Sequence, residues 1–200
     1  MDKKNKILKF IISVLFVYWY VIFSDQSDII AKTSIKQICL NQNQKETNQN
    51  KKELFRNIER KKNHIDVKIN EYQKIEKTVF GRSSEGGQVV GYFKGGDLVK
   101  VTAEFFGEMG KGQTYFYFDE KTPFFIISSD SYYSHPIYEK EPRRISEIVM
   151  EKYYSFGNQS ACWLVERKED TTSKESKESE AKKIDLLLKE VSEFRELLQK

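Results

Sequence analysis

The hydrophobic pattern begins with an uncharged, strongly apolar run from Phe10 to Phe23. Lysines at positions 3, 4, 6 and 9 precede it, and a basic segment followed by a short apolar run is typical of a secretory signal. Extended to residues 7–23, the run becomes long enough to cross a bilayer, because the side chain of Lys9 can reach the interface. Its bulky residues and the lack of a matching cleavage site favour an uncleaved signal-anchor over residues 1–24, with a cleaved signal peptide as the alternative.

The same lysines predict the orientation of the chain. Basic flanks of an apolar segment stay on the cytoplasmic side of the membrane. We therefore expect the bulk of the chain to lie outside the cytoplasm, in the cell envelope. It would be an inner-membrane-anchored protein in the periplasmic or extracellular space, or a secreted one if the signal is cleaved. Residues 25–46 are predicted to be a polar spacer that follows the anchor.

From Ile69 to Arg167 the pattern alternates between apolar and polar residues with a period of two. Glycine-rich segments at residues 83–87, 95–97 and 107–112 interrupt it. Short turns of this kind join antiparallel neighbours, whereas parallel strands need long crossover connections. The pattern predicts an antiparallel β-meander of about six or seven strands. They are placed near residues 72–80, 88–94, 97–106, 113–119, 123–129, 146–155 and 160–167.

One helix is predicted before these strands and one after them. Thr47 is a suitable N-cap for a helix that runs to about residue 63, and its apolar residues recur at steps of three and four. We expect this helix to cover the strands near residues 115–118 and 124–127, which are apolar on both faces. Residues 168–183 have almost no apolar content and are predicted to form a charged, solvated linker or a frayed polar helix.

The tail, residues 184–200, is predicted to be an amphipathic helix. Its apolar stripe has heptad spacing and consists of Ile184, Leu187, Val191, Phe194 and Leu198. So short a stripe leaves two alternatives open. The helix either docks on its own domain, or pairs with a second copy as a coiled coil and makes the protein a homo-oligomer.

These elements together predict an α+β fold. The expected organisation is a signal-anchor or signal peptide (1–24), a polar spacer (25–46), a helix plus antiparallel β domain (47–167), a charged linker (168–183) and an amphipathic helix (184–200). Composition agrees with a β-rich domain, since the chain has Tyr 11 and Phe 14 but Pro only 3. Lys+Arg 34 against Asp+Glu 30 leaves a net charge of +4, and the basic residues are dispersed. We therefore predict no nucleic-acid partner, because such binders concentrate their basic residues on one face.

Several segments of the β region combine glycine turns with aromatic and aliphatic residues. They are residues 85–93 (EGGQVVGYF), Leu98, residues 107–111 and residues 115–118. Together they resemble small exported bacterial proteins of unknown function whose hairpins carry a Tyr-Phe-x-x-Gly-x-Leu element. They are also distantly similar to MORN-type hairpin repeats. The resemblance covers roughly residues 70–165 and departs at residues 121–123, where a glycine turn is expected. It implies a β-hairpin sheet and an envelope setting, and it supplies no catalytic residue.

Groups that could carry catalysis or bind a metal are few. His64 and His135 are the only histidines, and no C-x-x-C or H-x-x-x-H spacing occurs, so we predict no metal, no cofactor and no catalytic residue. The glycines and lysine of residues 107–112 lack the spacing of a phosphate-binding loop. Cys162 lies within a predicted strand and is expected to be a buried, inert thiol. A disulfide with Cys39 is the alternative in an oxidising compartment.

The remaining candidate is the aromatic loop at residues 130–142. Tyr132, Tyr133, His135 and Tyr138 are ordinary loop residues or, in the sharper interpretation, the contact residues of a recognition loop. Aromatic side chains on a rigid scaffold contribute a large share of binding energy. We therefore predict a non-enzymatic binding module for an unidentified protein, peptide or glycan. The alternatives are an envelope hydrolase and a small proteinaceous inhibitor of a secreted enzyme that uses the same loop.

Overall fold

The structure is a computed structural model that describes residues 33–39, 48–140, 142, 144–156, 162–168 and 177–199. The predicted signal-anchor lies outside these ranges, so it stays a prediction. Within them, no helix combines the length and the apolar character that crossing a membrane requires.

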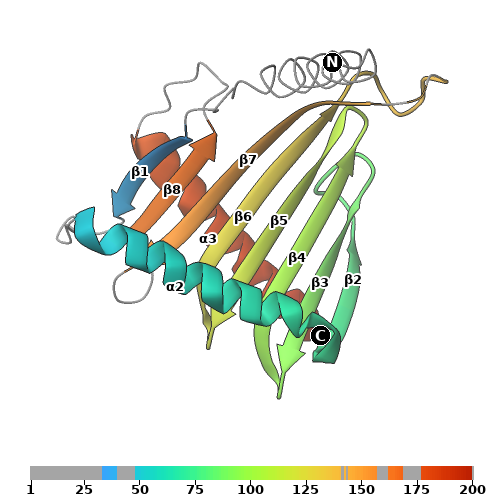
Figure 1. Ribbon diagram of the computed structural model, residues 1–200. Coiled ribbons are helices and arrows are strands. Elements are labelled where there is room, and N and C mark those ends of the chain that lie inside the picture. Colours follow the sequence, from blue (N-terminus) through green and yellow to red (C-terminus); the bar gives the residue numbers. More distant parts are fainter. Residues whose placement is uncertain are drawn as a thin grey trace, which may run out of the picture. The chain divides into compact units, whose positions relative to one another are not determined.

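Eight strands of the described residues form a single antiparallel sheet (Figure 1). They are β1 (Thr33–Cys39), β2 (Gln73–Val79), β3 (Gly87–Lys94), β4 (Asp97–Gly107), β5 (Gly110–Asp119), β6 (Thr122–Tyr133), β7 (Ile145–Phe156) and β8 (Cys162–Lys168). Strands β2 to β8 form a meander, because each pairs with the next along the chain. The first strand, β1, pairs with the last, β8, at the edge of the sheet.

Two long helices cover opposite faces of this sheet (Figure 1). Helix α2 (Asn48–Val67) crosses one face and is followed by a short 3-10 helix, η1 (Ile69–Glu71). Helix α3 (Lys177–Gln199) crosses the other face. The predicted α+β meander with a preceding and a following helix is thus confirmed, and both faces of its central strands are covered.

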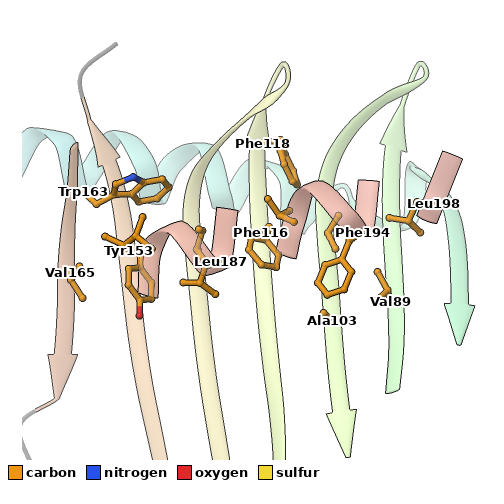
Figure 2. Close-up of a cluster of buried hydrophobic side chains, with 14 of the residues drawn as sticks. Val89, Ala103, Phe116, Phe118, Tyr153, Trp163, Val165, Leu187, Phe194 and Leu198 are labelled. Carbon is orange, nitrogen blue, oxygen red and sulfur yellow. The ribbon is translucent and has the colours of Figure 1, made fainter. Parts of the chain in front are cut away.

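The larger core cluster lies between α3 and the sheet (Figure 2). All five residues of the apolar stripe are buried in it, and Phe194 is only 1% exposed. Gly91 leaves room for the end of α3, because a Cβ there would lie 2.7 Å from Leu198 Cδ1. The stripe therefore docks on its own sheet, which was the first of the two alternatives. Whether the chain also forms oligomers stays a prediction.

A second core cluster lies between α2 and the sheet. Ile58 and Ile65 of α2 are buried against aromatic residues of β5, β6 and β7. The rings of Phe55 and Tyr154 meet edge to face, with centroids 4.5 Å apart. The narrow apolar stripe predicted for this helix is therefore enough to seat it on the sheet.

One strand, β1, lies inside the segment that was predicted to be a polar spacer, residues 25–46. Its isoleucines, Ile35 and Ile38, are three residues apart and so give no period-two signal. Pairing with β8 supplies the missing stability, and Ile38 is buried in the core that faces α3. The sheet consequently has eight described strands instead of the six or seven expected.

The position of β1 also changes the prediction for the cysteines. The register pairs Cys39 with Cys162, Cys162 is disulfide-bonded, and the chain contains no third cysteine. The expectation of an inert thiol at Cys162 is therefore wrong. It failed because Cys39 was assigned to a flexible spacer, whereas β1 holds it opposite Cys162.

Both helices are longer than the pattern predicted. Helix α2 continues to Val67, and α3 begins at Lys177, inside the predicted charged linker, for which a frayed polar helix was the alternative. Tertiary contacts explain both extensions, since Asp66 bonds to strand residues and Ala181, in the added part of α3, packs against the larger core. Tertiary contacts here outweigh the polar character of the local sequence.

Candidate functional site

Three chain connections meet at one end of the sheet, because alternate turns of an antiparallel meander lie at the same end. They join β2 to β3, β4 to β5 and β6 to β7. Backbone hydrogen bonds link them into one surface. The Glu85 N–H donates to the Phe106 carbonyl at 3.1 Å, and the Ile137 N–H donates to the Glu108 carbonyl at 3.0 Å.

Exposed hydrophobic side chains are concentrated at this end. In the described part of the chain, all the large hydrophobic residues that are exposed belong to it, except Val67 and Leu186. We call this set the apolar turn end; it comprises Phe80, Phe106, Met109, Tyr132, Ile137, Tyr138, Ile145, Ile148 and Met150. Phe80 is 80% exposed and Tyr138 is 72% exposed. Single exposed hydrophobic residues are common on monomers, but a gathering at one end is not.

The four residues predicted for binding all lie at the apolar turn end or directly beside it. Tyr132 and Tyr138 are exposed, whereas Tyr133 and His135 are partly buried. The Tyr133 N–H donates to the Met109 carbonyl at 2.8 Å, which ties the end of β6 to the β4–β5 hairpin. The two exposed tyrosines are therefore presented to solvent, and the other two support the loop.

His135 has a serine beside it, which bears on the hydrolase alternative. The Ser134 hydroxyl lies 3.0 Å from His135 Nδ1, and its oxygen also accepts a hydrogen bond from the Arg144 N–H at 3.3 Å. Ser134 is exposed, whereas a catalytic serine needs an activating base within a site that excludes water. These contacts suit a hydroxyl that closes the loop between β6 and β7.

The β4–β5 hairpin borders a hollow of about 320 Å³ whose lining includes Phe106, Met109 and Tyr132. Gly110 is required beside it, because a Cβ at this position would collide with the Ser131 carbonyl oxygen. The Lys111 ammonium also stands at the border of this hollow and donates a hydrogen bond of 2.9 Å to the Glu104 carboxylate. This hydrogen bond raises the pKa of Lys111 above its usual value, although burial opposes the increase.

A different hollow, of about 550 Å³, lies at the opposite end of the sheet between α2 and two hairpin tips. None of the four predicted binding residues lines it. The local sequence carries no signal for this hollow, because its lining comes from α2, β3–β4 and β5–β6, which only the fold brings together. As for metals, the residues that the structure describes hold no group of three or more potential ligands.

Comparison with known proteins adds no relative, since no family model, curated protein or solved structure matches this chain. The resemblance to exported hairpin proteins therefore stays a prediction.

Proposed function

We propose that this protein is a membrane-tethered, extracytoplasmic binding module without enzymatic activity, which contacts a partner protein through the apolar turn end. The observation that carries the proposal is the gathering of exposed hydrophobic side chains at that end. Apolar patches on soluble domains commonly mark interaction sites, because removing apolar surface from water lowers the free energy.

The side chains involved are of the kind that contribute most to binding. Phe80, Tyr132 and Tyr138 are aromatic, and aromatic residues dominate the energetics of protein interfaces. The backbone bonds between the three connections hold these side chains on a common frame. A rigid frame supports binding because less conformational entropy is lost on association.

The expected location of the domain, outside the cytoplasm, supports a protein partner within the envelope. A signal-anchor over residues 1–24 would leave the folded domain outside the cytoplasm, tethered through residues 25–32. The hydrolase and inhibitor alternatives stay predictions, since no contact described above favours either of them.

The proposal is tested by site-specific crosslinking in intact envelopes. A photoreactive amino acid at Tyr138 should capture a discrete partner, which mass spectrometry then identifies. The matched control places the same amino acid at Glu53, which is exposed but lies near the start of α2, outside the apolar turn end. Equal capture at both positions would contradict the proposal.

A second measurement separates binding from folding. The double substitution of Tyr138→Ser and Ile148→Ser removes two exposed side chains, so thermal stability should change little. Affinity for the identified partner should fall by about tenfold or more, since large interface side chains contribute on the order of 1–2 kcal/mol each. Glu53→Ser should leave the affinity unchanged. Localisation of the full chain in the cytosol would contradict the proposed extracytoplasmic location.

A further inference from the structure

The groove at the other end of the sheet has the size of a binding site. Its volume of about 550 Å³ falls within the range of ligand pockets, roughly 300–1,000 Å³. In Figure 1 the β3–β4 and β5–β6 hairpins reach past α2. Residues of both hairpin tips and of the helix line the groove. A neighbouring hollow of about 440 Å³ shares Arg60, Lys61 and Phe124 with it. The two hollows are therefore adjacent along the flank of α2.

Its floor is apolar. Leu98, Val99, Phe118 and Phe124 line it together with Ile65 of α2. The Lys61 ammonium stands 5.6 Å from the centre of the Phe124 ring, above the floor. An apolar side chain that entered the groove would be shielded from water on this floor, so the groove favours a ligand with at least one apolar group.

The two walls carry opposite charge. Arg60 and Lys61 line the α2 wall, whereas Asp119 and Glu120 line the β5–β6 tip. An ion pair between Lys61 and Asp119 joins the walls. Among the described residues, Arg60 and Glu120 take part in no ion pair, so each wall keeps one uncompensated charge.

The β3–β4 tip does not disturb this balance. It contributes Lys94 and Asp97 to the lining, and these two residues are partners in the β3–β4 register. The tip thus adds one charge of each sign. The opposed pair of Arg60 and Glu120 therefore remains as the feature that a ligand can recognise.

Glu120 occupies a backbone conformation that favours glycine. Its φ is 55°, and it is the sole non-glycine residue with positive φ in the described part of the chain. The β3–β4 turn uses Gly95 and Gly96, with φ of 59° and 93°, for the same purpose. A side chain in this region costs about 1–2 kcal/mol, and strain of this kind is concentrated at functional sites. The two-residue turn between β5 and β6 imposes this conformation on Glu120 and holds the residue at the groove.

We propose that the groove binds an extended peptide segment of a partner protein, with an acidic, an apolar and a basic side chain at alternating positions. In an extended chain such side chains point to one face at intervals of about 7 Å. The acidic group pairs with Arg60, the apolar group lies on Phe124, and the basic group pairs with Glu120. A small anion or a singly charged lipid would pair with the charge of only one of the two walls. This proposal does not depend on the apolar turn end.

The test uses the full chain in detergent micelles and the probe acetyl-Glu-Gly-Phe-Gly-Lys-amide with a neutral fluorescent label. Fluorescence anisotropy measures its binding. Replacing both charged residues of the probe with Gln should weaken binding by about tenfold, because each exposed ion pair contributes up to about 1 kcal/mol. Replacing the Phe with Ala should weaken it by about tenfold or more.

A charge swap tests the contact with Glu120 directly. Glu120→Lys should weaken binding of the probe by about tenfold, and a probe that ends in Glu should bind this variant more tightly than it binds the natural chain. The matched control is Glu108→Lys, which makes the same charge change at the tip of the β4–β5 hairpin, at the other end of the sheet. It should leave binding unchanged.

Glu120→Gly separates binding from stability. The substitution removes the strained side chain, so the thermal midpoint should rise while binding of the probe weakens. A neutral or doubly acidic probe that binds as tightly as the original overturns the proposal. So does unchanged binding by Glu120→Lys. Loss of binding at the apolar turn end has no bearing on this outcome, so the two proposals fail separately.

Discussion

At the scale of single residues, the most telling contact is made by Asp66 at the end of α2. Its carboxylate accepts hydrogen bonds from the Lys100 ammonium at 2.7 Å and from the Lys62 ammonium at 2.8 Å. The Tyr117 hydroxyl also donates to it at 3.2 Å. Lys100 is thereby held beneath the helix, with its ammonium 4.8 Å from the centre of the Tyr117 ring. These contacts fix the position of α2 on the sheet.

The charge state of Asp66 leads to a prediction about pH. Burial alone would raise the pKa of Asp66, but the ammonium groups of Lys100 and Lys62 lower it overall. A carboxyl group whose pKa is lower when folded stabilises the fold above its unfolded pKa, near 4. This stabilisation is lost as the pH falls through the folded pKa. Asp66→Asn should therefore lower the free energy of unfolding at pH 7, by about 1 kcal/mol for a partly exposed group.

Urea unfolding at a series of pH values measures this effect. The difference between Asp66→Asn and the natural chain should shrink as the pH falls below about 4. Asp97→Asn is the matched control, because Asp97 is exposed and takes part in no ion pair among the described residues. A constant difference across the whole pH range would contradict the assigned role.

At the scale of elements, α3 illustrates how a docked helix is held. Phe194 packs between Phe105 and Phe116, with ring centroids at 6.1 Å and 6.3 Å. Arg82, from the connection between β2 and β3, donates to Glu190 at 2.9 Å and also pairs with Glu193. Its guanidinium lies 4.7 Å from the centre of the Phe194 ring. The helix is thus held on the sheet by its buried apolar stripe and, on its more exposed side, by the ion pairs between Arg82 and the two glutamates.

Substitution on α3 should separate the buried stripe from the exposed side of the helix. Phe194→Ala should lower the free energy of unfolding by about 3 kcal/mol or more, because it leaves a cavity in the larger core. Leu186→Ala, at a position 58% exposed, should change it by less than about 0.5 kcal/mol. Urea unfolding followed by tryptophan fluorescence provides the comparison. Equal effects would show that α3 is not held by its apolar stripe.

Elements with strong local signals could be predicted from the sequence, and those that depend on distant contacts could not. Strands β2 to β8 lie within a few residues of their predicted positions, because alternation and glycine turns mark them locally. β1 lacks alternation and is stabilised by pairing with β8. The first turns of α3 likewise have a polar sequence, and packing of Ala181 against the larger core favours the helix there.

At the scale of the whole molecule, topology assembles both candidate surfaces. Tyr132 and Tyr138 were predicted because aromatic residues are dense in one loop. Phe80 and Met109 were missed, because each stands in a separate connection and only the meander brings the connections to one end. The groove could not be predicted at all from local sequence, since α2 and two hairpins build it.

The disulfide makes the edge of the sheet sensitive to reduction. Because Cys162 is disulfide-bonded and β1 pairs only with β8 in the described sheet, reduction should free β1 to separate from that edge. We expect faster hydrogen exchange in β1 and β8, with little change in β3 to β6. The thermal midpoint should also fall, because a crosslink that closes a long loop contributes about 2–4 kcal/mol. Uniform exchange across the sheet on reduction would contradict this.

The pairing of β1 with β8 also has a consequence for the order of folding. Of the strands that the structure describes, β1 leaves the ribosome first, and its only partner leaves last. Completion of the sheet therefore needs a contact between distant parts of the chain, which slows folding. Until β8 arrives, β1 offers both of its edges to any neighbouring polypeptide. A chain delivered through a membrane from its N-terminus would expose that strand throughout its passage, so assembly of the sheet would be completed only after nearly the whole domain had crossed.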